Sequence, residues 1–338
     1  MNGVDRGRLR RLASETGMRD ADLGREIGIA LDRCFARIRV QISGRVGVGK
    51  SSVRAVLEAR GSFDEVDVTE AAAIDVPRSP DPILDGDVVV HVLASGAQAA
   101  DVEVLRSVPT AVAVLAKADT VADVPGTIAR LTATVGIAVL PLMGTIARSV
   151  SEGEPSSFAD LRVAATSLTE DMLLTPERFE LAASDAVVRR QRRDLVERIE
   201  LAGVRTLVAA LSADPTVDDA SLRRMLADVS GVEHVVDAVG RRVGDIRVDR
   251  EGRLLHRLTE LCVQYPSSSE AVEEYLSTDD AVLTIMRSAL RALNEVQDPG
   301  PPLDAAVEWH RRAEAFRDPD HRRAAGAISR GYLRLRAS

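Results

Sequence analysis

Aromatic residues are scarce in this chain. Phe, Tyr and Trp together make up 3% of its 338 residues, whereas hydrophobic residues as a whole make up 45%. The core must therefore be built from Ala, Val, Leu and Ile, which favours α/β and helical packing over an aromatic-rich β-sandwich. The length is sufficient for two or three domains with a sizeable core.

Cysteines and long apolar runs are also few. Cys34 and Cys262 are the only cysteines, and both lie in apolar helical patterns away from other metal ligands. We therefore expect buried free thiols. The N-terminal residues lack the charged-then-apolar pattern of a signal peptide. No uncharged run approaches the ~18–20 apolar residues that span a bilayer. We expect a cytoplasmic protein that lies at most peripherally on the inner face of the membrane.

Positive charge is in deficit, since 44 Lys and Arg residues are set against 52 Asp and Glu, a net charge of -8. Nucleic-acid binding needs clustered Lys and Arg, so no nucleic-acid partner is expected. The five histidines include no closely spaced pair suited to zinc. Nothing indicates a Ser-His-Asp or Cys-His centre. His91 lies in an apolar strand pattern, and we expect a hydrogen-bonded core residue there.

Three regions follow one another along the chain. Residues 1–35 are expected to be helical from Leu9, with polar breaks around Gly17 and Gly24. In residues 36–150, short apolar runs alternate with helical patterns, which predicts a parallel sheet covered by helices on both faces. Residues 151–338 begin with the polar linker SEGEPSS, and the helical stripes that follow it predict a bundle. The apolar runs that predict strands read RIRVQIS, AAAIDVP, DVVVHVLAS, TAVAVLAKAD and GIAVLPL.

The segment Gly44–Ser51 reads GRVGVGKS and fits the pattern G-x-x-x-x-G-K-[ST] without a mismatch, between a strand and a helix. Its glycines let backbone N–H groups turn inward around phosphate oxygens, and the helix adds the positive end of its dipole. Lys50 is expected to reach the β- and γ-phosphates, and the Ser51 hydroxyl to bind Mg²⁺. The predicted phosphate-binding residues are Gly44, Arg45, Val46, Gly47, Val48, Gly49, Lys50, Ser51 and Ser52.

A guanine-reading segment is expected at the end of VAVLAKAD. Lys117 and Asp119 have the spacing of N/T-K-x-D, in which the lysine stem covers the base and the carboxylate accepts from its N1–H and amine. Ala116 replaces the first residue of that pattern, so the usual side-chain tie to the glycine turn is missing. After the next strand, Gly144 and Thr145 are placed to offer backbone N–H groups to the guanine carbonyl. A solvated charge pair is the alternative interpretation of Lys117 and Asp119.

The residues for hydrolysis are less complete. Asp75 has the position of a D-x-x-G carboxylate that contacts Mg²⁺ through water, but Arg78 replaces the glycine. The alternative is a loop carboxylate that binds no metal. Thr69 is the one threonine between the turn and Asp75, either a metal ligand or a strand residue. Arg45 either lies across the phosphates as a catalytic arginine or faces solvent. We expect nucleotide binding with slow hydrolysis.

Taken in order, GRVGVGKSS, IDVPRSPDP with DGDVVVHVLAS, VAVLAKADTV and VGIAVLPLMGTIA resemble the G-domain motifs of bacterial dynamin-like GTPases of the actinobacterial type. The resemblance covers residues 20–245. It implies a P-loop NTPase fold, with a three-layer G domain and a mostly parallel sheet followed by an α-helical bundle. It also implies GTP or GDP and Mg²⁺ as ligands, self-association or pairing with a related GTPase, and peripheral membrane contact.

The sequence thus predicts a GTPase of weak or partner-dependent activity. Two alternatives stay open. The chain is a non-hydrolysing, nucleotide-binding scaffold subunit of a heteromeric complex, or it is a P-loop protein that binds ATP.

Overall fold

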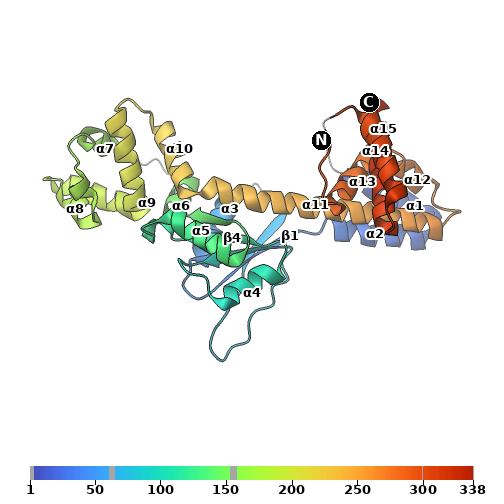
Figure 1. Ribbon diagram of the computed structural model, residues 1–338, viewed down its shortest axis with the longest axis horizontal. Coiled ribbons are helices and arrows are strands. Elements are labelled where there is room, and N and C mark those ends of the chain that lie inside the picture. The colour runs from blue at the N-terminus through green and yellow to red at the C-terminus, as the bar shows by residue number, and fades with distance from the viewer. Residues whose placement is uncertain (1–3, 61–64, 153–157, 299, 338) are drawn as a thin grey trace. The chain divides into compact units, whose positions relative to one another are not determined.

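The computed structural model describes residues 4–60, 65–152, 158–298 and 300–337 (Figure 1). Contacts divide the chain into two compact units. The sheet unit runs from Ile38 to Arg242, and the helical unit joins Met1–Arg37 to Val243–Ser338. The N-terminal helices, which we predicted as a segment of their own, therefore pack within the same unit as the last helices. The predicted linker at residues 151–157 lies mostly outside the described residues.

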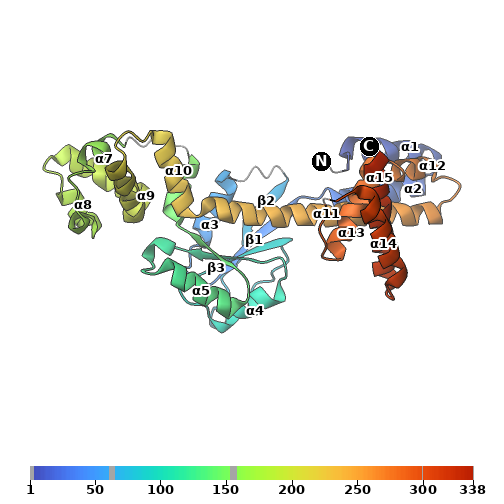
Figure 2. The same cartoon turned by 45° about the horizontal axis from the view of Figure 1, so that its top comes forward.

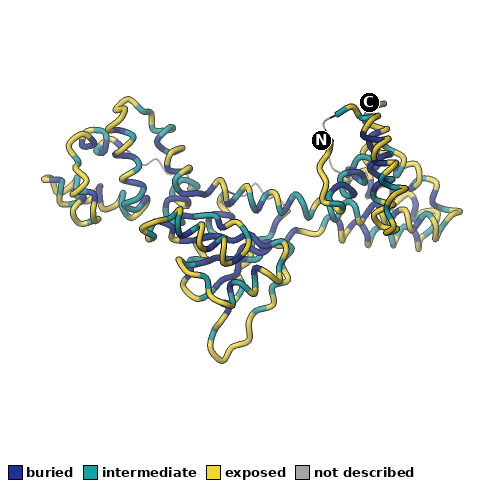
Figure 3. The backbone as a smooth tube through the Cα atoms, in the orientation of Figure 1, coloured by how far each residue is buried: buried dark blue, intermediate teal, exposed yellow. Residues whose placement is uncertain are grey.

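Five strands form one sheet in the order β2-β1-β3-β4-β5. All four neighbouring pairs are parallel, which confirms the predicted α/β region with a parallel sheet. β3 and β4 are buried along their whole length, as continuous apolar runs require (Figure 3). The strands are β1 (Ile38–Gly44), β2 (Val66–Glu70), β3 (Val88–Leu93), β4 (Val112–Ala116) and β5 (Val139–Leu142).

One predicted strand was wrong. The run AAAIDVP at residues 71–77 is not a strand, and the strand lies just before it at Val66–Glu70, in register with Ile38–Ile42 of β1. β-Branched residues such as Val66 and Val68 fit a pleated surface, whereas consecutive alanines favour a strand less. Asp75 consequently lies in the loop beyond β2 and not at a strand end.

Helices cover both faces of the sheet (Figure 2). The chain steps outward from β1 to β2 in one direction and from β3 to β5 in the other. Because crossovers between parallel strands are right-handed, this reversal places the connecting helices on opposite faces. α3 (Lys50–Arg60) packs with α6 (Gly144–Glu152), and α4 (Ala99–Ser107) packs with α5 (Val124–Val135).

The remainder of the sheet unit is helical, in agreement with the predicted loss of strands. Its core gathers Phe158 and Phe179 around the apolar side of α9 and extends to Ile146 of α6. α9 is interrupted at Glu200, whose φ of 55° and ψ of 173° are not helical. The elements are α7 (Ala159–Ala164), the 3₁₀ turn η2 (Glu170–Leu173), α8 (Pro176–Leu181), α9 (Ala186–Ala213), α10 (Asp219–Ser230) and the first part of α11 (Val232–Gln264).

Among its described residues, the helical unit has one apolar core between the first helices and the end of α11 and another around Trp309 and Tyr332. Neither Cys34 nor Cys262 forms a disulfide, as predicted; Cys34 is buried as expected, whereas Cys262 is only half-buried. Within the described part of the chain, no helix is both long and apolar enough to cross a membrane. The helices are α1 (Arg6–Arg19), α2 (Ala21–Cys34), the rest of α11, α12 (Glu270–Leu276), α13 (Asp279–Ala292), α14 (Pro302–Ala315) and α15 (Pro319–Ala337).

The break between α1 and α2 lies at Asp20, not at the two glycines that we expected to interrupt the helices. The Asp20 carboxylate accepts hydrogen bonds from the N–H groups of Asp22 and Leu23 and so begins α2. Gly17 and Gly24 lie inside the helices, where they allow close approach. A Cβ atom on Gly24 would lie 2.4 Å from the Gly17 Cα.

Gly24→Ala is therefore expected to destabilise the helical unit by about 1–3 kcal/mol, the usual range for overpacking. Gly28→Ala is the matched control on the same helix, because a Cβ there would meet nothing within 4 Å. That variant should be neutral or more stable by about 0.5–1 kcal/mol, since alanine favours a helix over glycine. Urea unfolding measures both changes, and equal effects of the two substitutions would contradict the prediction.

Candidate functional site

The glycine turn lies where the strand order reverses, between β1 and β3, which is where open parallel sheets form ligand crevices. Gly44, Gly47 and Gly49 have φ values of 146°, 73° and 104°, a region that favours glycine. A Cβ on Gly44 would lie 2.6 Å from the Val92 carbonyl oxygen. At Gly44 both the conformation and the space exclude any larger residue.

The other residues of the turn differ in exposure. Val48 is buried, whereas the Val46 side chain is exposed. Ser52, in the first turn of α3, faces Gly144 at the start of α6, where a Cβ would lie 3.0 Å from the Ser52 Cβ. The small residues at these two positions let both helices begin close together at the same edge of the sheet.

Lys50 and Ser51 share a partner that sequence reasoning missed. The buried Lys50 ammonium donates to the carbonyl oxygens of Gly44 (3.3 Å) and Arg45 (3.2 Å). It also lies 3.8 Å from Glu70 Oε1, and the Ser51 hydroxyl donates to Glu70 Oε2 at 3.0 Å. Glu70 is the last residue of β2 and meets the turn because β2 pairs with β1 in parallel register.

Ser51 and Glu70 together offer a hydroxyl and a carboxylate oxygen, both suited to Mg²⁺. No group of three or more His, Cys, Asp or Glu side chains among the described residues could hold a metal ion. Mg²⁺ in nucleotide sites commonly takes one or two protein ligands and completes its shell with waters and substrate phosphates. The pair therefore fits a phosphate-dependent Mg²⁺ site better than a site made by the protein alone.

Asp75 is held in a tight loop after β2. Its N–H donates to Asp81 Oδ1 at 2.7 Å. The Gln98 amide, oriented with its nitrogen toward Asp75, donates to the Asp75 carboxylate at 3.1 Å and accepts from Arg45 at 2.9 Å. Arg78 has a φ of 65°, so its backbone takes the left-handed conformation that the missing glycine would favour. The structure brings Ser51 to Glu70, and it links Asp75 to Gln98.

Arg45 points into a buried ion pair. Its Nε donates to Asp101 Oδ2 at 3.0 Å, and its NH2 group donates to the Gly96 carbonyl at 2.9 Å. His91 Nε2 lies 3.0 Å from Asp101 Oδ1, so His91 is a buried, hydrogen-bonded core residue as predicted. Burial alone would raise the pKa of Asp101. The hydrogen bonds from His91 and the Gln98 N–H, and the attraction to His91 and Arg45, outweigh it and lower that pKa below its usual 3.8.

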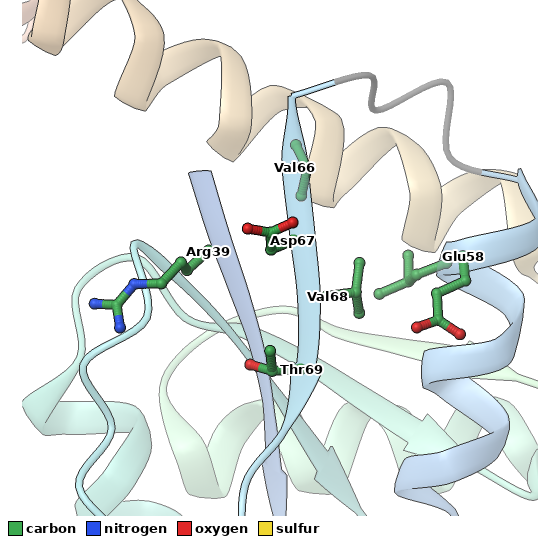
Figure 4. Close-up of a pocket in the computed structure, with 7 residues that line it drawn as sticks. Arg39, Glu58, Val66, Asp67, Val68 and Thr69 are labelled. Carbon is green, nitrogen blue, oxygen red and sulfur yellow. The ribbon is translucent and has the colours of Figure 1, made fainter. Parts of the chain in front are cut away.

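Thr69 is exposed on the edge strand β2, opposite Gln41 of β1. Side chains alternate between the faces of a strand, so Thr69 points away from the face on which Glu70 meets Ser51. Figure 4 shows Val68 on the side of Glu58 from α3 and Thr69 on the other side of the strand. A pocket lies beside this edge strand. The residues that line it are Arg39, Leu57, Glu58, Val66, Asp67, Val68 and Thr69. Thr69 and Ser51 are not brought together.

Lys117 and Asp119 follow β4 at the same edge as the glycine turn. Lys117 has a φ of 54°, and its ammonium donates to the Gly47 carbonyl oxygen at 3.1 Å. The tie to the turn that Ala116 cannot make is thus made by the next residue. A Cβ on Gly49 would lie 3.2 Å from the Ala116 Cβ, which explains why a small residue precedes Lys117.

Thr145 and Asp119 lie near a carboxyl group that the sequence did not indicate. Glu200, at the interruption of α9, lies near enough to the side chains of Asp119 and Thr145 for both to influence its pKa. Its Oε2 atom is buried and has no hydrogen-bond partner within the described part of the structure. Burial first, and then the hydrogen bond and charge of Asp119, raise the pKa of Glu200 from 4.5 to about 7, while Thr145 acts in the opposite direction.

This raised pKa predicts a pH-dependent stability. The native state keeps the Glu200 proton up to about pH 7, whereas the unfolded chain releases it near 4.5. Between these values the native state binds more protons, so its stability falls as pH rises and then levels off. The urea midpoint of the wild type should fall relative to that of Glu200→Gln between pH 5 and 8, because only the wild type can lose a proton from residue 200. A difference between the two proteins that is constant with pH would contradict this.

Two functional candidates, Glu70 and Glu200, were missed. For Glu70 the signal in the sequence is the β-branched pattern that ends at this residue. That pattern favours a strand more strongly than the three alanines that follow it. For Glu200 the sequence carries no such signal, because the buried residues Ile199 and Gly203 keep a helical spacing of four positions across the interruption.

Comparison of the chain with protein-family models, with curated proteins and with solved structures found no match.

Proposed function

We propose that the chain is a guanine-nucleotide-binding P-loop protein, and that its sheet unit contains a three-layer G domain. The observation that carries the proposal is the hydrogen bond from Lys117 to the Gly47 carbonyl. It joins the glycine turn after β1, which would bind phosphate, to the segment with Lys117 and Asp119 after β4, which would bind the base. The groups proposed to bind the phosphates and the base therefore lie at one edge of the sheet, and Thr145 follows at the end of β5.

The roles of the residues follow from their chemistry. The N–H groups of the glycine turn, the start of α3 and the Lys50 ammonium would bind phosphate oxygens. Ser51, with Glu70 behind it, would hold Mg²⁺, which neutralises phosphate charge when bound. Asp119 would accept from the guanine N1–H and amine, and Lys117 would cover the base. A metal role for Asp75 stays a prediction.

Slow hydrolysis is the second part of the proposal. Phosphoryl transfer depends on groups that stabilise developing charge and orient water. Arg45 is engaged by Asp101 and Gly96, and Thr69 lies on the face of β2 away from Ser51. These placements also support the alternative of a nucleotide-binding scaffold that does not turn over. Association with a second copy or with a related GTPase, and contact with a membrane, stay predictions.

The proposal is tested by calorimetric titration with GTP, GDP and ATP in the presence of Mg²⁺. We expect guanine nucleotides to bind selectively and Asp119→Asn to lose that selectivity. Hydrogen bonds to charged groups are worth about 1.5–3 kcal/mol each, so GTP affinity should fall by roughly 10- to 150-fold for each bond lost. Asp123→Asn in the following loop is a control with the same change of charge. Equal binding of ATP and GTP would favour the ATP-binding alternative.

Phosphate release at saturating GTP then separates the two forms of the proposal. Measurable turnover indicates a GTPase, and its absence despite tight binding indicates the scaffold. Binding of none of the three nucleotides would contradict both.

A further inference from the structure

The side chain of Arg45 is held at all three of its nitrogen atoms. Its Nε donates to Asp101 Oδ2 at 3.0 Å, and its NH2 group donates to the Gly96 carbonyl oxygen at 2.9 Å. Its NH1 group donates to the Gln98 side-chain oxygen at 2.9 Å. These acceptors belong to the segment between β3 and α4 and to the first turn of α4. Because Arg45 is part of the glycine turn, its side chain ties that turn to the following crossover.

Asp101 is the fixed end of this connection. Its side chain is completely buried, and so is that of His91 in β3. Asp101 Oδ1 lies 3.0 Å from His91 Nε2, and Oδ2 accepts from the Gln98 N–H at 2.8 Å as well as from Arg45. A carboxylate that is buried and hydrogen-bonded from a strand and from a helix start has little freedom to move. The Arg45 guanidinium is therefore attached to the sheet and not only to a loop.

The backbone of Arg45 lies on the side of the turn that would meet phosphates, because its carbonyl oxygen accepts from the Lys50 ammonium at 3.2 Å. The next two residues offer no side chain for anchoring. Val46 is 74% exposed, and Gly47, held through its carbonyl by Lys117, has open space where a Cβ would lie. Glycine loses more conformational freedom on ordering than any other residue. This part of the turn therefore depends on Arg45 for its conformation.

We infer that Asp101 is a positioning residue for phosphate binding, which acts through Arg45 to hold the glycine turn in its phosphate-binding conformation. The inference rests on the proposed function. It gives Arg45 a role other than a catalytic arginine or a solvent-facing side chain. A site that is ordered before its ligand arrives avoids the free-energy cost of ordering on binding. Loss of the anchor should therefore weaken every ligand that binds through its phosphates, whatever its base.

The test titrates the full chain with inorganic triphosphate and with GTP, both in the presence of Mg²⁺. In Arg45→Met the affinities for both ligands should fall by the same factor, roughly 5- to 30-fold, which corresponds to the ordering of about one residue of backbone. The preference for GTP over ATP should stay as in the wild type. Unchanged triphosphate affinity, or a loss confined to GTP, overturns the inference.

Arg45→Lys separates the anchor from the charge. Lysine keeps the positive charge, but its single nitrogen cannot reproduce the fork that reaches Asp101, Gly96 and Gln98 together. Its triphosphate affinity should therefore stay below that of the wild type. Full recovery by lysine would mean that the charge alone matters, and it would overturn the inference.

Asp101→Asn gives the sharpest comparison, because the two explanations predict opposite signs. Removal of a negative charge near the turn would by itself favour an anionic ligand. The inference predicts weaker triphosphate binding, since asparagine has one acceptor oxygen in place of two. Arg45→Met combined with Asp101→Asn should lose no more affinity than the more affected single variant, because both changes break one contact. Tighter or unchanged binding by Asp101→Asn, or losses that multiply in the double variant, would overturn the inference.

Leu105→Ala is the matched control for a general loosening of α4. Leu105 is buried on the same helix, in the apolar core between the sheet and α5. Its truncation should lower stability to urea, as cavities in a core do, but leave the triphosphate affinity of the folded protein unchanged. A loss of affinity equal to that of Arg45→Met would overturn the inference.

Two further outcomes distinguish this inference from the proposed function. A lower turnover of Arg45→Met at saturating GTP, with unchanged affinity, would make Arg45 a catalytic residue and overturn the inference while leaving nucleotide binding in place. If the wild type binds neither triphosphate nor any of the nucleotides, the proposed function fails, and the inference fails with it.

Discussion

Lys50→Met is expected to lower the affinity for GTP and GDP by about 100-fold or more. The Lys50 ammonium is buried against the turn and donates to two of its carbonyl oxygens. A bound phosphate would replace these neutral acceptors with charged ones, and hydrogen bonds to charged groups are worth about 1.5–3 kcal/mol each. Methionine keeps the length of the side chain, so the loss reports the charge and not a cavity. Calorimetric titration measures the change.

Arg54→Ala is the matched control for that substitution. Arg54 also carries a positive charge on α3, but it is exposed and pairs with Glu58 one turn further on. Its removal should leave nucleotide affinity within a factor of two, apart from a small general effect of charge that falls with salt. If Lys50→Met binds GTP as tightly as Arg54→Ala does, the glycine turn is not the phosphate site.

Asp101→Ala is expected to destabilise the sheet unit by about 3–5 kcal/mol, the usual loss when one partner of a buried ion pair is removed. Asp101 is completely buried and accepts from Arg45, from the Gln98 N–H and from His91. The substitution leaves the Arg45 guanidinium without its carboxylate and His91 without its partner. Urea unfolding measures the loss.

Two comparisons identify the cause of that loss. Glu103→Ala on the exposed side of α4 should change stability by less than about 0.5 kcal/mol. Arg45→Met added to Asp101→Ala should recover part of the stability, because it removes the unpaired charge. No recovery in the double variant would mean that the ion pair is not the source.

The lowered pKa of Asp101 gives the same pair an acid dependence. A carboxyl whose native pKa is depressed contributes stability above its unfolded value, here 3.8, and loses it as pH falls through the native value. The wild type should therefore lose stability more steeply than Asp101→Ala in acid below about pH 4.

Features encoded within a few residues were predictable. GRVGVGKS specifies its own turn, since three glycines supply the positive φ values that the backbone needs. The apolar runs of β3 and β4 are visible because buried parallel strands are continuous in hydrophobicity, and β1 is visible from the alternation of its buried Ile38, Val40 and Ile42 with polar residues. The positions of Lys117, Asp119 and Thr145 follow, because the carboxyl ends of parallel strands meet at one edge. The strand before Asp75 was misplaced, because two adjacent apolar runs competed and only pairing with β1 decides between them.

By itself, then, the sequence determined the glycine turn, the parallel sheet and the chain order of the residues at its edge, since local backbone preference and hydrophobic period suffice for these. Only the tertiary structure decided which side chains meet there. Glu70 faces Ser51 because of the register between β2 and β1. Arg45 turns to Asp101, and Glu200 comes near Asp119 and Thr145 from an interrupted helix. Each of these brings together charged or polar groups far apart in the chain, and such an approach leaves no periodic trace in the sequence.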